Sequence, residues 1–254
     1  MIYSKINDWR DLQNKVCDLL NQVGFVAEKE KNISTPRGKI EVDVFAYDPN
    51  SIDQINYIIE CKNWNNKIPQ SVVHSFTTVM NETGGNIGYI ISKNGFQKGS
   101  FDYINSTNIK IFTFDELQNK YLNLWLERYF CERIRSYSDN LIQYVEEINS
   151  KRFRSINKLD NASKKKFNNL LDKHQLLGFY LTVFSVHSAS VPNLFKAKNT
   201  IKLPDFDTIK DNFNNYFCLP LKSNNYSDLL IELEPIIDKI TNDFNNVFGK
   251  NIFK

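Results

Sequence analysis

The sequence lacks the features of a membrane-spanning or secreted protein. No run of about 18 apolar residues is present, so no transmembrane helix is expected. The N-terminal segment MIYSKINDWRDLQNK is polar and charged, without the apolar stretch of a signal peptide. We therefore expect a cytoplasmic protein that has no membrane partner.

Cysteines are few and widely separated along the chain. Cys17, Cys61, Cys131 and Cys218 form no CxxC or CxxH pair, which argues against a zinc site. In a reducing cytoplasm these thiols would stay unpaired. The sequence also lacks a GxxxxGK[ST] phosphate-binding loop, so any ATP dependence would require a separate ATPase or sensor partner.

The excess of positive charge is small. The 254 residues include 32 Lys and Arg against 29 Asp and Glu, a formal net charge of +3. This balance neither requires nor excludes nucleic acid as a partner, because the distribution of charge matters more than its sum. A hydrophobic fraction of 41% is ordinary for a globular chain with one large or two small domains.

The first 115 residues alternate between helical and strand patterns. Such an order, with helical crossovers between strands, predicts an α/β fold in which helices flank a mixed sheet. Residues 28–38 are polar and contain Pro36 and Gly38, so they are interpreted as a connecting stretch. Helices are expected at 9–23, 69–82 and 97–106, and strands at 39–47, 55–62, 87–92 and 109–114.

In the strand at 39–47 the apolar residues follow a period of two. This alternation predicts that Val42 and Val44 share one face, while Asp43 and Phe45 point to the other.

After residue 115 no strand alternation of any length is found. We therefore predict a boundary there, between an α/β domain at 1–115 and a mainly α-helical domain at 116–254. Pro235 is expected to divide the last helix. The helical patterns lie at 115–149, 168–186 and 226–248.

Two carboxylates and a lysine occupy strand positions for which these residue types have little preference. Glu60 and Lys62 share a face because they are two residues apart, and a neighbouring strand can place Asp43 beside them. Two adjacent carboxylates repel each other unless a cation is present. Their hard oxygen atoms favour Mg²⁺ or Mn²⁺, which can activate water and stabilise a phosphoryl transition state. The lysine ammonium would stabilise the same developing charge.

The segments Glu41–Val44 and Ile58–Trp64 resemble the PD-(D/E)xK nucleases, and specifically the Mrr-like restriction endonucleases. The similarity extends over roughly residues 8–116. It includes the helix that carries Val73 and Phe76, and the segments Ile90-Ile91-Ser92, Gly95-Phe96 and Ile109-Lys110-Ile111. No resemblance is found for the remainder of the chain.

The resemblance implies a role for each residue of the motif. Asp43 and Glu60 would bind the divalent metal together with the main-chain carbonyl of Cys61. Lys62 would position or help to deprotonate the attacking water and stabilise the negative charge. Gln70, at the start of the next helix, is a weaker candidate for orienting water or phosphate.

One position departs from the pattern of many relatives, which carry a carboxylate on the first helix. Gln13 stands near that position in this sequence, which leaves the number and affinity of bound metal ions open. Trp64, in the loop after the Glu60–Lys62 motif, is a candidate for contact with a nucleotide. His74 has apolar neighbours and is interpreted as a packing or surface residue rather than a catalytic base.

Simpler interpretations exist for the charged residues. Asp43, Glu60 and Lys62 could form a cross-strand ion pair, although the strand context and the downstream similarity favour catalysis. The basic run at 151–166 could be a solvated face or could neutralise phosphates. Its candidate nucleic-acid-binding residues are Lys151, Arg152, Arg154, Lys164, Lys165 and Lys166.

The sequence therefore predicts a two-domain DNA endonuclease that depends on Mg²⁺ or Mn²⁺. The Mrr-like nuclease domain at 1–115 would cleave DNA, and the helical domain at 116–254 would recognise DNA, dimerise or bind a partner. The protein is expected to act in restriction or anti-phage defence as a homodimer or larger oligomer. An alternative is a nucleic-acid-binding or assembly module of a larger defence complex, for which cleavage is absent or dispensable. An RNA nuclease with the same metal chemistry is a third possibility.

Overall fold

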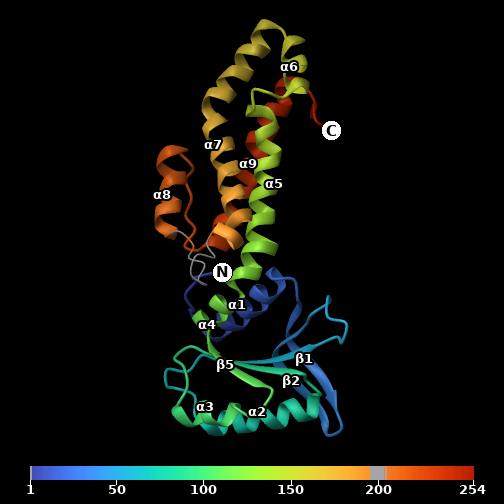
Figure 1. Cartoon of the computed structure of the whole chain (residues 1–254), viewed down its shortest axis with the longest axis vertical. Coiled ribbons are helices and arrows are strands. Elements are labelled where there is room, and N and C mark those ends of the chain that lie inside the picture. Colours follow the sequence, from blue (N-terminus) through green and yellow to red (C-terminus); the bar gives the residue numbers. More distant parts are fainter. Residues whose placement is uncertain (1, 195–202, 204) are drawn as a thin grey trace. The chain divides into compact units, whose positions relative to one another are not determined.

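The structure is a computed structural model that describes residues 2–194, 203 and 205–254, with side chains described up to 182 and again at 203 and from 205 (Figure 1). The chain divides into two compact units, Met1–Arg128 and Tyr129–Lys254, and each is described by itself. The side chain of His187 lies outside the residues whose side chains are described.

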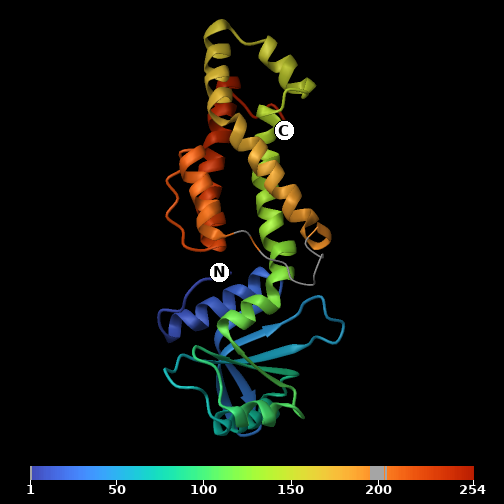
Figure 2. The ribbon, with the colours of Figure 1, turned by 60° about the vertical axis from the view of Figure 1, so that its left-hand side comes forward.

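The N-terminal unit is a mixed five-stranded sheet between helices, which confirms the expected α/β fold. The strand order is β1-β2-β3-β4-β5; the first three strands are antiparallel and the last three parallel. Helices α2 and α3 cover one face, and α1 and α4 the other (Figures 1 and 2). The elements are α1 (Trp9–Gln22), β1 (Val26–Thr35), β2 (Gly38–Tyr47), β3 (Asn56–Lys62), α2 (Gln70–Thr83), β4 (Ile87–Ser92), α3 (Lys98–Ile104), β5 (Ile109–Thr113) and α4 (Phe114–Trp125).

Strand β1 corrects the interpretation of residues 28–38 as a connecting stretch. It pairs with β2 along its length, from Val26 opposite Tyr47 to Thr35 opposite Gly38. It is one of the two edge strands of the sheet, so its polar side chains remain exposed and give no buried hydrophobic pattern. Main-chain hydrogen bonds to β2 therefore define this strand.

Burial in β2 alternates as expected from Ile40 to Ala46, but the contacts do not follow the alternation strictly. Val42 and Phe45 were expected on opposite faces, but both pack against the same hydrophobic cluster beneath α2. The regular ladder to β3 ends at the pair Val44 and Ile59. Opposite this region of β2, Glu30 of β1 has a φ of 51°. The pairing of β1 with β2 is interrupted at Glu30 and Asp43, between the pairs Lys29–Val44 and Lys31–Val42.

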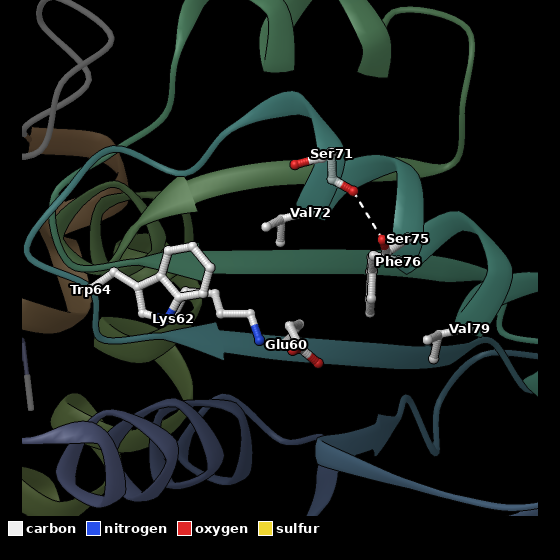
Figure 3. A pocket seen from close by; sticks show the side chains of 8 residues that line it. All are labelled: Glu60, Lys62, Trp64, Ser71, Val72, Ser75, Phe76 and Val79. Carbon is white, nitrogen blue, oxygen red and sulfur yellow. Dashed lines mark hydrogen bonds and ion pairs between the residues drawn. The ribbon is translucent and has the colours of Figure 1, made fainter.

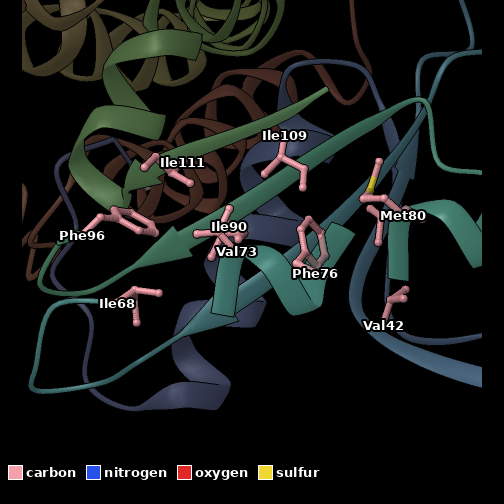
Figure 4. Packing of buried hydrophobic residues seen from close by; sticks show 10 residues of the cluster. Val42, Ile68, Val73, Phe76, Met80, Ile90, Phe96, Ile109 and Ile111 are labelled. Atoms are coloured by element: carbon pink, nitrogen blue, oxygen red, sulfur yellow. The ribbon is translucent and has the colours of Figure 1, made fainter. Parts of the chain in front are cut away.

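The cluster beneath α2 leaves no space for a side chain at one position of β4. A Cβ atom at Gly88 would lie 2.7 Å from Cε1 of Phe76 and 2.8 Å from the sulfur of Met80. Glycine at this position therefore lets α2 pack closely on the sheet. The buried members of the cluster are Val42, Ile58, Ile68, Val73, Phe76, Met80, Ile90, Phe96, Ile109 and Ile111 (Figure 4).

We expect Gly88→Ala to lower the free energy of unfolding by about 1–3 kcal/mol, because the added methyl group overpacks the core against Phe76 and Met80. Urea denaturation of the full chain measures the change. Ser106→Ala, at an exposed position of the same unit, is the control and should stay within about 0.5 kcal/mol. An unfolding midpoint of Gly88→Ala equal to that of the control would contradict the close packing.

The C-terminal unit is helical in its described residues, as expected. The pattern at 115–149 is not one helix: α4 belongs to the N-terminal unit, and a π-helical segment, η1 (Leu126–Phe130), follows it. Trp125 of α4 donates from Nε1 to Gln22 Oε1 of α1 at 2.7 Å, so α4 is held against α1 within the unit that extends to Arg128. The remaining helices are α5 (Cys131–Val145), α6 (Ser150–Asn157), α7 (Asn161–Leu194), α8 (Phe206–Tyr216) and α9 (Tyr226–Phe248).

Helix α9 continues through Pro235, so the expectation that this proline divides it is wrong. A proline inside a helix costs about 3 kcal/mol because it lacks an N–H group and crowds the preceding turn. The apolar face of α9 is buried on both sides of the proline, with Leu230 and Leu233 before it and Ile237 and Ile240 after it. Burial of this face offsets the local cost.

The C-terminal unit also contains a buried histidine, His174 on α7. Burial lowers the pKa of His174, and the charge of Lys173 lowers it further, while Asp243 of α9 opposes the shift. The unfolded chain therefore binds a proton at a higher pH than the folded unit. The contribution of His174 to stability is complete above about pH 6.5, the ordinary histidine pKa, and is lost as the pH falls below it.

We expect the free energy of unfolding of the C-terminal unit to fall less between about pH 7 and pH 5 in His174→Gln than in wild type, because the variant removes this linkage. Urea denaturation at several pH values, followed by helical circular dichroism, measures the slope. His74→Gln removes a histidine of the N-terminal unit and is the control. The linkage would be refuted by equal pH slopes in wild type and His174→Gln.

Candidate active site

Asp43 lies where strands β2 and β3 separate. The last regular pair of their ladder is Val44 and Ile59, and the main-chain N–H of Cys61 lies beyond it. That N–H donates to Asp43 Oδ2 at 2.7 Å, so a side-chain carboxylate replaces the missing main-chain acceptor. The separation of the strands thus fixes the Asp43 carboxylate beside the end of β3.

Gln13 holds the second oxygen of the same carboxylate. Its Nε2 donates to Asp43 Oδ1 at 2.8 Å, and the Gln13 residue is only 7% exposed. The position at which relatives often carry a carboxylate therefore does reach the site. In this chain it contributes a hydrogen-bond donor to Asp43, where a carboxylate would have added a further negative charge.

Glu60 and Lys62 project from the same face of β3, as the sequence predicts. Lys62 Nζ forms an ion pair with Glu60 Oε1, and both side chains are about three-quarters buried. Burial raises the pKa of Glu60, and the negative charge of Asp43 raises it further, while Lys62 opposes the shift. The repulsion between the two carboxylates favours a bound cation.

These two charged residues line a cleft of about 340 Å³ between β3 and α2 (Figure 3). Trp64 also lines it, and α2 forms the opposite wall. The α2 residues that line the cleft are Ser71, Val72, Ser75, Phe76 and Val79. The charged pair therefore faces an open cleft beside β3.

Ser71 and Ser75 of this wall were not predicted. The Ser75 hydroxyl donates to the main-chain oxygen of Ser71 at 3.0 Å (Figure 3). Their spacing of four residues, on the helical face of Val72 and Phe76, was the available signal. Asn63, directly after Lys62, has a buried side-chain oxygen without a hydrogen-bond partner in the described part of the chain.

Gln70 does not line this cleft. Its side-chain oxygen packs against α3, where a Cβ atom at Gly99 would lie 2.8 Å from it. A role for Gln70 in orienting water or phosphate remains a prediction. His74 is exposed, and its Nδ1 lies 2.8 Å from the hydroxyl of Tyr103, consistent with a packing or surface residue.

The basic run of the C-terminal unit contains one residue that cannot reach a phosphate. Arg152 is buried, donates from Nη1 to the main-chain oxygen of Glu146 at 3.1 Å and stacks over the ring of Phe167. Burial lowers the pKa of Arg152. Its inclusion among the nucleic-acid-binding candidates is therefore corrected. The other candidates retain exposed or partly exposed positions on α6 and α7: Lys151, Arg154, Lys164, Lys165 and Lys166.

The donor set at the end of β3 fits a hard divalent cation. No group of three or more His, Cys, Asp or Glu side chains that could hold a metal occurs among the described residues. Asp43 and Glu60 nevertheless supply carboxylates, and the main chain of Cys61 supplies a carbonyl. Mg²⁺ is commonly bound by one or two carboxylates and completed by water and substrate phosphate. The Cys61 thiol itself is buried, and burial raises its pKa, so it is not an activated nucleophile.

Residues 5–121 match the sequence model Mrr_cat, a family described as "Restriction endonuclease". This match confirms, for residues 5–121, the resemblance to the restriction endonucleases. The family match supports a nuclease. No curated protein is significantly similar to the chain in sequence.

Several solved structures are similar to the chain. A protein of unknown function, AF1548, is 15% identical with a TM-score of 0.40, covering 72% of this chain and 99% of that one. The DNA modification-dependent restriction endonuclease AspBHI is 10% identical with a TM-score of 0.33, covering 42% and 29%. A repair endonuclease from Pyrococcus abyssi is 16% identical with a TM-score of 0.32, covering 44% and 50%. These TM-scores are below 0.5, so the assignment rests on the family match.

Two variants of Asp43 separate its hydrogen bond from its charge. Both Asp43→Ala and Asp43→Asn relieve the repulsion with Glu60, but only Asn can still accept from the Cys61 N–H. In EDTA, we expect Asp43→Ala to be less stable than Asp43→Asn by about 1–3 kcal/mol, the cost of an unpaired buried donor. Urea denaturation measures the difference. Equal stabilities of the two variants would refute the role of Asp43 as the acceptor for the Cys61 N–H.

Proposed function

We propose that the N-terminal unit is a divalent-metal-dependent endonuclease that hydrolyses phosphodiester bonds of DNA. The observation that carries this proposal is the placement of Asp43, Glu60 and Lys62 together at the point where β2 and β3 separate. The restriction endonuclease family of residues 5–121 supports the reaction class and DNA as the substrate.

Asp43, Glu60 and the carbonyl of Cys61 would hold the cation, Mg²⁺ or Mn²⁺. When bound, the cation supplies a positive charge that lowers the pKa of water and stabilises a negatively charged transition state. Gln13 and the Cys61 N–H keep the Asp43 carboxylate in position. This bracing restricts the carboxylate before substrate binds and so reduces the reorganisation required in the reaction.

Lys62 would contact the substrate directly. Its ammonium pairs with Glu60 and lines the cleft, where it can position the attacking water and stabilise charge on a phosphate oxygen. Water adds its hydroxyl group to phosphorus, the bond from phosphorus to the leaving oxygen breaks, and that oxygen takes up a proton. Phosphoryl transfer depends mainly on such positioning and charge stabilisation.

For the C-terminal unit we propose DNA recognition, dimerisation or partner binding. The exposed lysines of α6 and α7 can neutralise phosphates without reading sequence. One active site per chain also suits a homodimer or larger oligomer for double-strand cleavage. A role in restriction or anti-phage defence, with a separate ATPase or sensor partner, is the setting that the family suggests.

Plasmid cleavage tests the enzymatic proposal. We expect wild-type protein to nick or linearise plasmid with Mg²⁺ or Mn²⁺ and to lose this activity in EDTA. Asp43→Asn, Glu60→Gln and Lys62→Ala should each reduce the rate at least about 100-fold, because the two carboxylates hold the cation and the lysine ammonium stabilises negative charge in the transition state. Lys67→Ala, an exposed lysine nearby in sequence that does not line the cleft, is the matched control.

The same experiment separates the alternative functions. Equal inactivity of wild type and variants on methylated DNA, unmethylated DNA and RNA would count against an autonomous nuclease. The nucleic-acid-binding module would be favoured by a different result. In that case a larger complex keeps its function with Lys62→Ala but loses it when the basic residues are neutralised, namely Lys151, Arg154, Lys165 and Lys166. Faster cleavage of labelled RNA than of DNA would instead indicate an RNA nuclease.

A further inference from the structure

The lining of the cleft separates charge from apolar surface. Among the described residues that line it, Glu60 and Lys62 carry charge, whereas the remainder are apolar or bear hydroxyl groups. Trp64 lies at one end and Val79 at the other, with the charged pair between them (Figure 3). A phosphodiester placed at Lys62 would therefore have the Trp64 ring on one side and, beyond Glu60, the apolar residues of α2 on the other.

Trp64 provides a flat aromatic surface on a fixed main chain. Trp64 is 45% exposed. The loop that carries it is held by Asn94, whose Nδ2 donates to the carbonyl oxygens of Trp64 and Asn65 at 3.0 and 2.9 Å. Lys62 Nζ lies 5.9 Å from the centre of the Trp64 ring. An exposed indole held beside the phosphate-binding lysine is suited to stacking against a base.

We propose that the cleft binds one unstacked nucleotide base next to the scissile phosphate, and that this base stacks on Trp64. The preferred substrate is then single-stranded DNA or a duplex with a locally unpaired nucleotide. This inference rests on the proposed nuclease function, because it places the base beside the scissile phosphate that Lys62 would contact.

The size of the cleft supports a single nucleotide. Its volume of about 340 Å³ is at the lower end of the roughly 300–1,000 Å³ typical of small-molecule sites. In a paired duplex the bases are stacked and their faces are covered, so an enzyme must unstack a base before contacting its face. An already unpaired nucleotide avoids that energetic cost.

Fluorescence titration tests the stacking without requiring cleavage. In EDTA, a 12-residue oligo(dT) should quench the tryptophan emission of the full-length protein as the thymine stacks on Trp64. Trp64→Phe should lose most of the quench. Trp64→Ala should bind oligo(dT) about 10-fold or more weakly, because stacking on an aromatic side chain contributes about 1–3 kcal/mol per base. Trp9→Phe, which alters another exposed tryptophan of the same unit, should behave like wild type.

Binding also tests the substrate preference. Wild-type protein should bind a duplex with a single-nucleotide bulge at least about 10-fold more tightly than the matching paired duplex, and Trp64→Ala should lose most of this preference. Asn94→Ala should weaken oligo(dT) binding while leaving the thermal unfolding midpoint near that of wild type, because it releases the loop.

Two results would overturn the proposal: unchanged oligo(dT) affinity in both Trp64 variants, or equal quenching by the paired duplex and the single strand. Failure of the nuclease function is distinguished by a metal-dependent cleavage assay on both the plasmid and a labelled single-stranded oligonucleotide. If the protein cleaves no substrate but shows a quench that depends on Trp64, the proposed base binding stands and the proposed catalytic role is refuted.

Discussion

The separation of β2 from β3 at Asp43 is the constraint on which the site depends. A main-chain donor at the end of a ladder must be satisfied when it is buried, and the Cys61 N–H is satisfied by the Asp43 carboxylate. This single hydrogen bond fixes an acidic side chain beside the end of β3, where Glu60 and Lys62 already share a face. Gln13 completes the arrangement from α1. The hydrogen bonds of the folded chain therefore hold two carboxylates close together although they repel each other.

The same arrangement links stability to chemistry. A raised pKa for Glu60, caused by burial and by Asp43, indicates a site that favours positive charge over a second carboxylate. Lys62 supplies part of that charge within the protein, and a divalent cation would supply the remainder. Functional sites commonly carry such strain because the charges needed for the reaction are unfavourable together until ligand binds. The surrounding core beneath α2 is closely packed and keeps the walls of the cleft in position.

The C-terminal unit illustrates why a run of basic residues is a weak guide to function. Arg152 lies within the run at 151–166, yet it stacks over Phe167 and caps the chain at Glu146 from a buried position. Its neighbours Lys151 and Arg154 are exposed on the same short helix. The helical period, which places consecutive residues on different faces, separates a structural arginine from cations that can contact phosphate. Mutations that neutralise the whole run would therefore combine loss of packing with loss of charge.

The sequence by itself determined the α/β order of the first unit, the helical character of the second, and the shared face of Glu60 and Lys62, because these follow from local periodicity. It also located Asp43 and Trp64 beside the motif. Only the tertiary structure decided that polar β1 is an edge strand, that α9 passes through Pro235, and that Gln13 reaches Asp43. Each of these depends on contacts between residues distant in sequence. Local pattern cannot report the end of the β2–β3 ladder, since that end is set by how two strands pair and separate in space.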